Sequence, residues 1–110
     1  MVTTSSPFGG QARTRVLLAL RLLDESYPRE LARILGLPLS GVQMAVRGLE
    51  RDGLVAGRSA GRTQLVRLDP RYFARDELQR YLLKLAAADT ELQRRVAALR
   101  RRPRRTGKPR

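Results

Sequence analysis

Residues 29–55 read RELARILGLPLSGVQMAVRGLERDGLV, and this stretch decides how the chain folds. The apolar residues of its second half recur at steps of three and four, the spacing of one helix face: Leu39, Val42, Val46 and Leu49. Pro28 suits the first turn of a shorter helix before it, and Gly36 is the kind of residue that follows a helix end. The pattern predicts two helices joined by a short turn.

The second of these helices carries a polar face opposite its apolar one. The residues of that face are Ser40, Gln43, Met44, Arg47 and Arg51. The helix also contains Gly41 and Gly48, each of which costs roughly 0.5–1 kcal/mol relative to alanine. The polar face is either an ordinary solvated surface or a surface that binds a partner, and the glycines call for a reason of their own.

The sequence on either side supplies further elements. Residues 11–24 are helical by pattern, but Leu18 and Leu22 form a second apolar stripe beside the one expected to face the core. Two short strands are predicted at 54–58 and 63–68, joined by a turn that contains Gly61. A long helix is predicted to follow this hairpin.

The long helix, residues 71–101, carries a heptad seam. Its positions are Leu78, Leu82, Leu85, Asp89, Leu92, Val96 and Leu99. At 1.5 Å per residue this helix would be roughly 45 Å long, more than a domain of short elements can cover. We therefore expect the seam, with Leu18 and Leu22, to form a homodimer interface. The alternatives are a helix that packs only on its own domain, and a break at Asp89-Thr90, where Thr90 and Gln93 resemble a capping box.

The composition limits the classes of function. The chain has neither cysteine nor histidine, which excludes disulfides, thiolate or imidazole metal sites, and Cys or His catalysis. We find no phosphate-binding glycine loop and no nucleophile motif, so we predict that the protein is not an enzyme and uses no cofactor or metal. No apolar run could span a membrane and no secretory segment is visible, so the expected compartment is the cytoplasm.

The net charge of +13 indicates a polyanionic partner, although an arginine-rich composition can also reflect a GC-rich genome. Residues 100–110, RRRPRRTGKPR, contain seven basic and no acidic side chains. The expected organisation is a flexible N-terminus at 1–9, a folded domain at 10–70, a dimerisation helix at 71–101 and a disordered basic tail at 102–110.

Residues 29–55 resemble the helix-turn-helix of the ArsR and MarR-like repressors, which are winged helix-turn-helix transcriptional regulators. RELA opens the first helix, GL makes the turn, GVQMAVRGLE resembles the recognition helix, and DGLV leads into the wing. GRSAGRTQLVRL resembles the wing itself, so the resemblance covers about residues 8–70. It implies a mostly α fold of α+β type, with a two-stranded wing and a long C-terminal helix.

Four segments are also similar to the winged domains that accompany nucleotidyltransferase-type toxin–antitoxin proteins: FGGQARTRVLLAL, YPRELARILGL, GVQMAVRGLERDGLV and DELQRYLLK. Those domains often carry VQR in the recognition helix, where this chain has Met44 in place of the arginine. No nucleotidyltransferase motif is present, so this resemblance implies a stand-alone module.

The resemblance also implies which residues contact DNA. In this fold the recognition helix lies in the major groove, where Gln can bond adenine and Arg can bond guanine. The wing lies beside the minor groove, whose negative potential favours arginine. The predicted contacts are Arg29, Ser40, Gly41, Gln43, Met44, Arg47, Arg51, Arg58, Ser59 and Arg62.

The sequence thus predicts a homodimeric regulator, expected to be a repressor, that binds specific double-stranded DNA and no membrane. Two alternatives belong to other classes. One is an interaction module that binds a toxin, a nucleotidyltransferase or another protein. The other is an RNA- or ribosome-associated protein that acts through its arginine tail. Metal sensing, common among ArsR-like regulators, is not expected because the usual ligands are missing.

Overall fold

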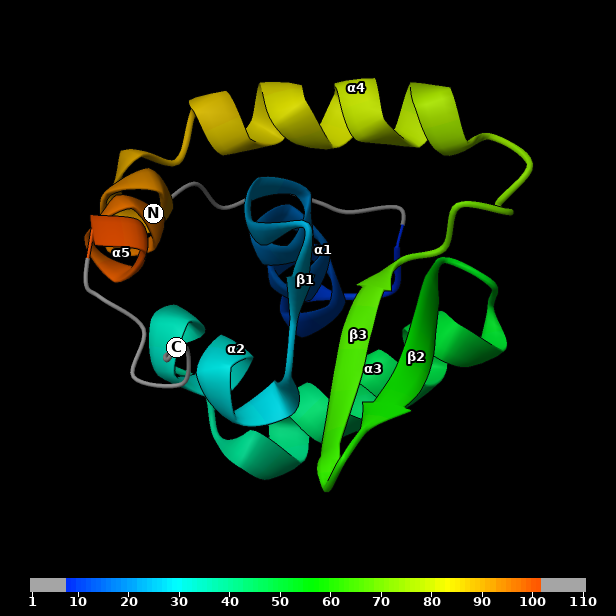
Figure 1. The fold of residues 1–110 in the computed structure, drawn as a ribbon. Coiled ribbons are helices and arrows are strands. Elements are labelled where there is room, and N and C mark those ends of the chain that lie inside the picture. The colour runs from blue at the N-terminus through cyan, green and yellow to red at the C-terminus, as the bar shows by residue number, and fades with distance from the viewer. Residues whose placement is uncertain (1–7, 102–110) are drawn as a thin grey trace.

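The computed structural model describes residues 8–101, which form five helices and a three-stranded antiparallel sheet that lies at one side of the molecule (Figure 1). The elements are α1 (Gln11–Leu23), β1 (Glu25–Ser26), α2 (Pro28–Leu35), α3 (Leu39–Arg51), β2 (Val55–Ala60), β3 (Thr63–Leu68), α4 (Arg75–Ala87) and α5 (Thr90–Arg101). The predicted winged helix fold is confirmed. The flexible N-terminus was predicted at 1–9, of which residues 1–7 lie outside the described residues, and the disordered tail predicted at 102–110 lies outside them entirely.

Helix α1 is the centre of the core. It packs against α2, α3, α4, α5 and β3, and in Figure 1 it lies between α4 on one side and the α2–α3 pair on the other. Val16, Leu17 and Leu20 are almost completely buried. Leu18, which was predicted to form a free second stripe with Leu22, is also a core residue, while Leu22 is only partly buried. The predicted second stripe packs within the chain because other helices cover α1 on more than one side.

The turn between α2 and α3 has the chemistry that the sequence predicts. Pro28 is the first residue of α2, and Gly36 ends this helix with a φ of 66°, a left-handed conformation that glycine adopts without strain. Near the start of α2, the buried Ser26 hydroxyl donates to the Glu30 carboxylate at 2.6 Å. This bond satisfies an acidic side chain that would otherwise be costly to bury.

The wing is longer than predicted, and the sheet has one more strand. Ala60 pairs with Thr63, so the first strand continues to residue 60 and only Gly61 and Arg62 form the loop. The short strand β1 pairs with β3 and puts Ser26 opposite Val66. Two residues are too few to show a strand periodicity, which is why the sequence pattern did not reveal β1.

The prediction of one long C-terminal helix is wrong, because the chain breaks between α4 and α5. Asp89 Oδ1 accepts the backbone N–H of Leu92 at 3.1 Å, the contact of a helix N-cap. The Gln93 side chain donates to the Ala86 carbonyl at 2.6 Å and so links the two helices. The break was foreseen as an alternative, but the capping residue is Asp89 and not Thr90.

The break also changes the role of the heptad seam. Leu78, Leu82, Leu92 and Val96 are buried in the core of their own chain, so their prediction as a free dimer surface is wrong. The bend lets both halves of the seam pack against α1. Of the remaining seam leucines, Leu85 and Leu99 are partly buried. The polar residue in the seam, Asp89, is the cap that makes the bend.

Candidate nucleic-acid interface

The outer face of α3 carries the predicted recognition residues. Five of them are exposed: Ser40, Gln43, Met44, Arg47 and Arg51. Met44 is 67% exposed, which is unusual for a side chain of this size and polarity. The apolar face of the same helix lies in the core. The division of α3 into a buried and a solvent-facing side is therefore as predicted.

The two glycines of α3 have different surroundings. A Cβ added to Gly48 would lie 2.8 Å from Nη1 of Arg13, whose guanidinium packs against this part of the helix. Arg13 Nη2 donates to Asp52 Oδ2 at 2.5 Å, which ties α1 to the end of α3. At Gly41 an added Cβ would meet nothing within 4 Å. An alanine at position 48 would therefore have to displace the Arg13 guanidinium, whereas an alanine at position 41 would displace no side chain.

This difference gives a test by paired substitutions. Gly41→Ala should raise the free energy of unfolding by up to about 1 kcal/mol, the normal gain of alanine in a helix. Gly48→Ala should not show this gain, because the new methyl displaces Arg13. In an Arg13→Ala background, however, Gly48→Ala should raise the free energy of unfolding by the normal amount, because no guanidinium is displaced. Urea denaturation of the single and double variants measures these values, and an equal gain at Gly48 in both backgrounds would contradict the contact.

The Arg13–Asp52 pair also predicts a pH dependence. The hydrogen bond from Arg13 is the largest cause that lowers the pKa of Asp52 from its usual 3.8. Because the folded-state pKa is the lower one, this carboxylate stabilises the fold above pH 3.8 and loses its effect as the pH falls through the folded value. Asp52→Asn should therefore reduce the free energy of unfolding at neutral pH. Below pH 3.8, the stability of this variant should fall less steeply with pH than that of the parent chain. Urea denaturation across this pH range is the measurement, and an unchanged acid slope would speak against it.

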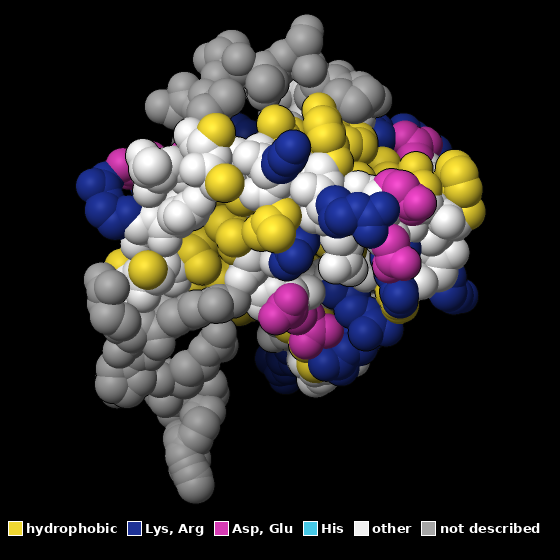
Figure 2. All heavy atoms as spheres, turned by 90° about the horizontal axis from the view of Figure 1, so that it is seen from above, with side chains coloured by type: hydrophobic (Ala, Val, Ile, Leu, Met, Phe, Trp, Pro, Cys, Tyr) yellow, Lys and Arg dark blue, Asp and Glu magenta, His cyan; other side chains and the backbone are white. Residues whose placement is uncertain are grey.

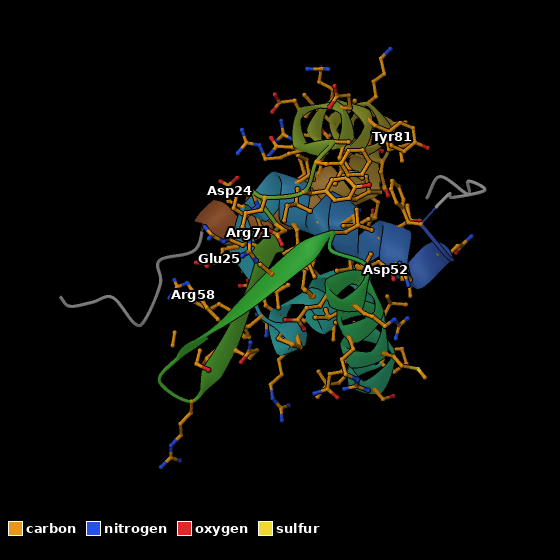
Figure 3. The ribbon with its side chains drawn as sticks, turned by 90° about the vertical axis from the view of Figure 1, so that its right-hand side faces the viewer. Asp24, Glu25, Asp52, Arg58, Arg71 and Tyr81 are labelled. Carbon is orange, nitrogen blue, oxygen red and sulfur yellow. The ribbon has the colours of Figure 1, made fainter. Side chains whose placement is uncertain are left out.

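In the wing, the predicted contacts Ser59 and Arg62 are exposed, but Arg58 has an intramolecular partner. Its Nε and Nη2 donate to the two carboxylate oxygens of Glu25 at 3.1 and 3.2 Å (Figure 3). Arg58 therefore holds the wing to β1, and Glu25 occupies two of the nitrogens with which this arginine could bind a phosphate. The pairing was not predictable locally, since the two residues are far apart in sequence.

A hollow of about 290 Å³ lies between the start of α2, the start of α3 and the tip of the wing. It is lined by Tyr27, Pro28, Arg29, Leu39, Gln43, Arg62, Thr63 and Gln64. Three predicted DNA contacts, Arg29, Gln43 and Arg62, thus come together from three separate elements. The sequence analysis missed Tyr27, Thr63 and Gln64, although the last two follow directly after the predicted wing turn.

Residues 8–101 contain neither a metal-binding group of acidic side chains nor a helix suited to span a membrane. Among these residues, no three acidic side chains are placed so that they could hold one metal ion. In the same part of the chain, no helix combines the length and the apolar character that crossing a membrane would require.

Neither a protein-family model nor a curated protein matches the chain. Solved structures do. HlyU from Vibrio cholerae is 26% identical with a TM-score of 0.60, over 74% of this chain and 79% of that one. HlyU from Vibrio vulnificus, described as a transcriptional regulator, is 25% identical with a TM-score of 0.61, over 74% of this chain and 78% of that one.

A third structure agrees in fold alone. It is a homodimeric winged helix-turn-helix DNA-binding domain from Mycobacterium bovis, described as a possible ArsR-family transcriptional regulator. It is 18% identical with a TM-score of 0.54, over 83% of this chain and 92% of that one. The fold and these neighbours confirm the winged helix-turn-helix resemblance seen in the sequence: the chain is similar to winged helix-turn-helix transcriptional regulators, one of which is described as a possible member of the ArsR family.

Proposed function

We propose that this protein is a transcriptional regulator that binds specific double-stranded DNA and acts as a repressor. The observation that carries the proposal is the convergence of exposed polar side chains from α2, α3 and the wing on one hollow. The tip of the wing and α3 lie on the same side of the molecule, opposite α4 (Figure 1). A duplex could therefore meet both elements at once.

The chemistry of this surface fits the grooves of B-DNA. The major groove is wide enough for one helix, and Gln43 and Arg47 are exposed on the side of α3 that would enter it. Arg62 at the wing tip would lie beside the adjacent minor groove. Arg29, at the start of α2, lines the same hollow as Gln43 and Arg62, and we expect it to bind the phosphate backbone.

We also propose that the protein acts as a homodimer, because two recognition helices can then read two half-sites about one helical turn apart. The similar domain from Mycobacterium bovis is described as homodimeric. Leu22, Leu85 and Leu99 remain only partly buried, and the face above α4 shows hydrophobic side chains between basic ones (Figure 2).

Light scattering tests the assembly. A dimer should give twice the 12.4 kDa of the chain, and Leu85→Glu should reduce this mass because a charge at a partly buried position opposes association. Leu92→Glu is unsuitable for this purpose, since Leu92 lies in the core and its loss would unfold the chain. A mass of one chain at micromolar concentration would refute the dimer.

Selection of bound fragments from random duplex DNA tests the DNA-binding function. We expect an enriched inverted repeat, because a symmetric dimer reads the same half-site twice. A pool without any enriched motif would exclude sequence-specific binding. If binding also ended when residues 102–110 were removed, the protein would instead be a general polyanion binder that acts through its basic tail.

A further inference from the structure

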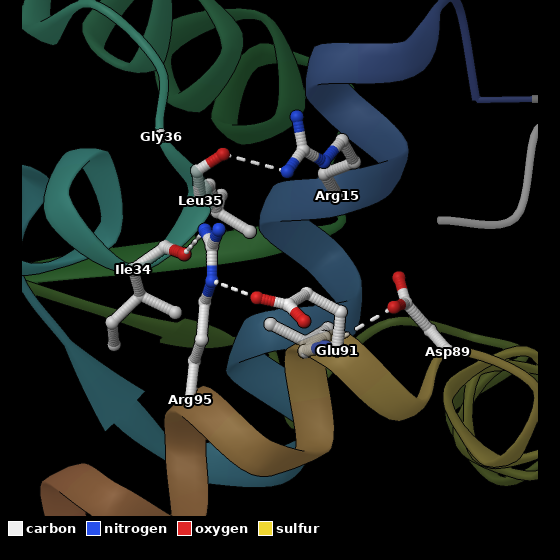
Figure 4. Close-up of a pocket in the computed structure, with 8 residues that line it drawn as sticks. Arg15, Ile34, Leu35, Gly36, Asp89, Glu91 and Arg95 are labelled. Carbon is white, nitrogen blue, oxygen red and sulfur yellow. Dashed lines mark hydrogen bonds and ion pairs between the residues drawn. The ribbon is translucent and has the colours of Figure 1, made fainter.

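A second hollow lies away from the wing, between α1, the end of α2 and α5 (Figure 4). Its volume of about 210 Å³ is roughly seven times the ~30 Å³ that one water molecule occupies in the liquid. One part of its wall is apolar and comes from Ile34, Leu35 and Leu92. The other part is charged, and the proposed DNA contacts do not use it.

Two guanidinium groups from different helices hold the end of α2 at this hollow. Arg15 of α1 donates to the Leu35 carbonyl at 2.6 Å, and Arg95 of α5 donates to the Ile34 carbonyl at 2.7 Å. Carbonyls in the last turn of a helix have no helical partner, so these bonds satisfy them. A guanidinium has five N–H donors, and the bonds found within residues 8–101 leave several donors of both arginines unused.

Carboxylates of the chain already interact with these arginines. Glu91 Oε2 accepts from Arg95 Nε at 2.9 Å, which is the largest cause of the lowered pKa of Glu91. The pKa of Arg15 is lowered chiefly because burial removes water from it, while the charge of Asp89 acts in the opposite direction. Two positive and two negative groups therefore balance at this wall.

The unused donors of the two arginines, rather than the net charge, indicate the kind of ligand. A singly charged carboxylate matches the planar fork of a guanidinium, with two parallel hydrogen bonds. A doubly charged phosphate would be repelled more strongly by Asp89 and Glu91, which line the same hollow. The apolar wall favours a ligand with a short hydrocarbon tail.

We propose that this hollow binds a small monocarboxylate with a short apolar tail. The carboxylate accepts hydrogen bonds from the unused N–H groups of Arg15 and Arg95, and the tail packs on Ile34, Leu35 and Leu92. Because the same two arginines hold α2, the first helix of the helix-turn-helix, an occupied hollow changes the attachment of α2 to α1 and α5. An effect on DNA affinity follows from this, and that step rests on the proposed function.

Amide NMR spectra of the full chain test the site with butyrate as the probe. We expect saturable shifts at Gly36, Glu91 and Leu92, and a smaller response to inorganic phosphate or to butylammonium. Arg15→Ala should weaken butyrate binding roughly tenfold or more, the value of a charged hydrogen bond. Glu91→Gln should strengthen it, because Arg95 is then freed from an internal carboxylate.

The matched control is Arg33→Ala, which removes an exposed arginine from the last turn of α2 outside the hollow. It should leave butyrate binding little changed. Arg15→Lys keeps the charge but lacks the fork, so it should bind weakly even if Arg15→Ala fails to fold. Equal responses to butyrate and phosphate, or unchanged binding in both Arg15 variants, would overturn the proposal.

A separate titration of DNA with and without butyrate distinguishes the two proposals. If the chain binds butyrate but no specific DNA, the carboxylate site stands and the proposed function fails. If it binds specific DNA but shows no butyrate-dependent shifts, the proposed function stands and the carboxylate site fails.

Discussion

Replacement of Leu82 by alanine should lower the free energy of unfolding by about 2–5 kcal/mol, the cost of a cavity at a fully buried leucine. Leu82 has no exposed surface and lies in the core that α4 shares with α1. If its role is to fill the core of its own chain, the loss should be nearly the same over about a hundredfold range of protein concentration. Thermal and urea unfolding of the variant and the parent chain measure it.

The neighbouring Leu83 is the matched control. It is 47% exposed on the same helix, so Leu83→Ala should change stability by less than about 0.5 kcal/mol if no partner covers it. If Leu82→Ala lowered the free energy of unfolding only slightly, and by more at lower protein concentration, the seam would instead be a subunit interface. The comparison therefore separates core packing from assembly within one turn of one helix.

Gln43→Ala and Arg47→Ala should each lower the ratio of specific to non-specific DNA affinity by roughly tenfold or more, since the hydrogen bonds to one base provide ~1–3 kcal/mol of discrimination. Both side chains are exposed on α3, and Gln43 also lines the hollow beside the wing. Because a helix holds both side chains in fixed positions, the hydrogen bonds that they form depend on the base sequence of the DNA. Competition of operator against random duplex at two salt concentrations measures the ratio.

Two controls separate these residues from the total charge. Arg80→Ala removes an exposed arginine from α4, on the side of the molecule opposite α3, and should leave the ratio unchanged. Deletion of residues 102–110 should weaken binding to all duplexes alike and flatten its salt dependence, by about 0.9 log units per log unit of salt for each phosphate that the tail neutralises. Full specificity in both alanine variants, together with its loss on tail deletion, would refute the assignment of α3.

The helix-turn-helix and the wing could be predicted from the amino-acid sequence. The apolar spacing in α3, Pro28 and Gly36 around α2, and the glycine turn at Gly61 are local signals, because backbone geometry fixes them within a few residues. The exposed face of α3 followed from the same periodicity. What the pattern reports is that a residue is buried, and it does not report what buries it.

The surface that covers each apolar stripe could not be predicted in this way, because it depends on how the helices pack. The seam of α4 and α5 looked like a dimer contact because a straight helix would outrun the domain. The Asp89 cap bends the chain there, and both halves then reach α1. Three other contacts also join residues that are far apart in sequence. They are the contact of Gly48 with Arg13, the pairing of Arg58 with Glu25 and the hydrogen bond from Arg95 to α2. Such contacts depend on how whole elements pack, and local periodicity carries no information about that packing.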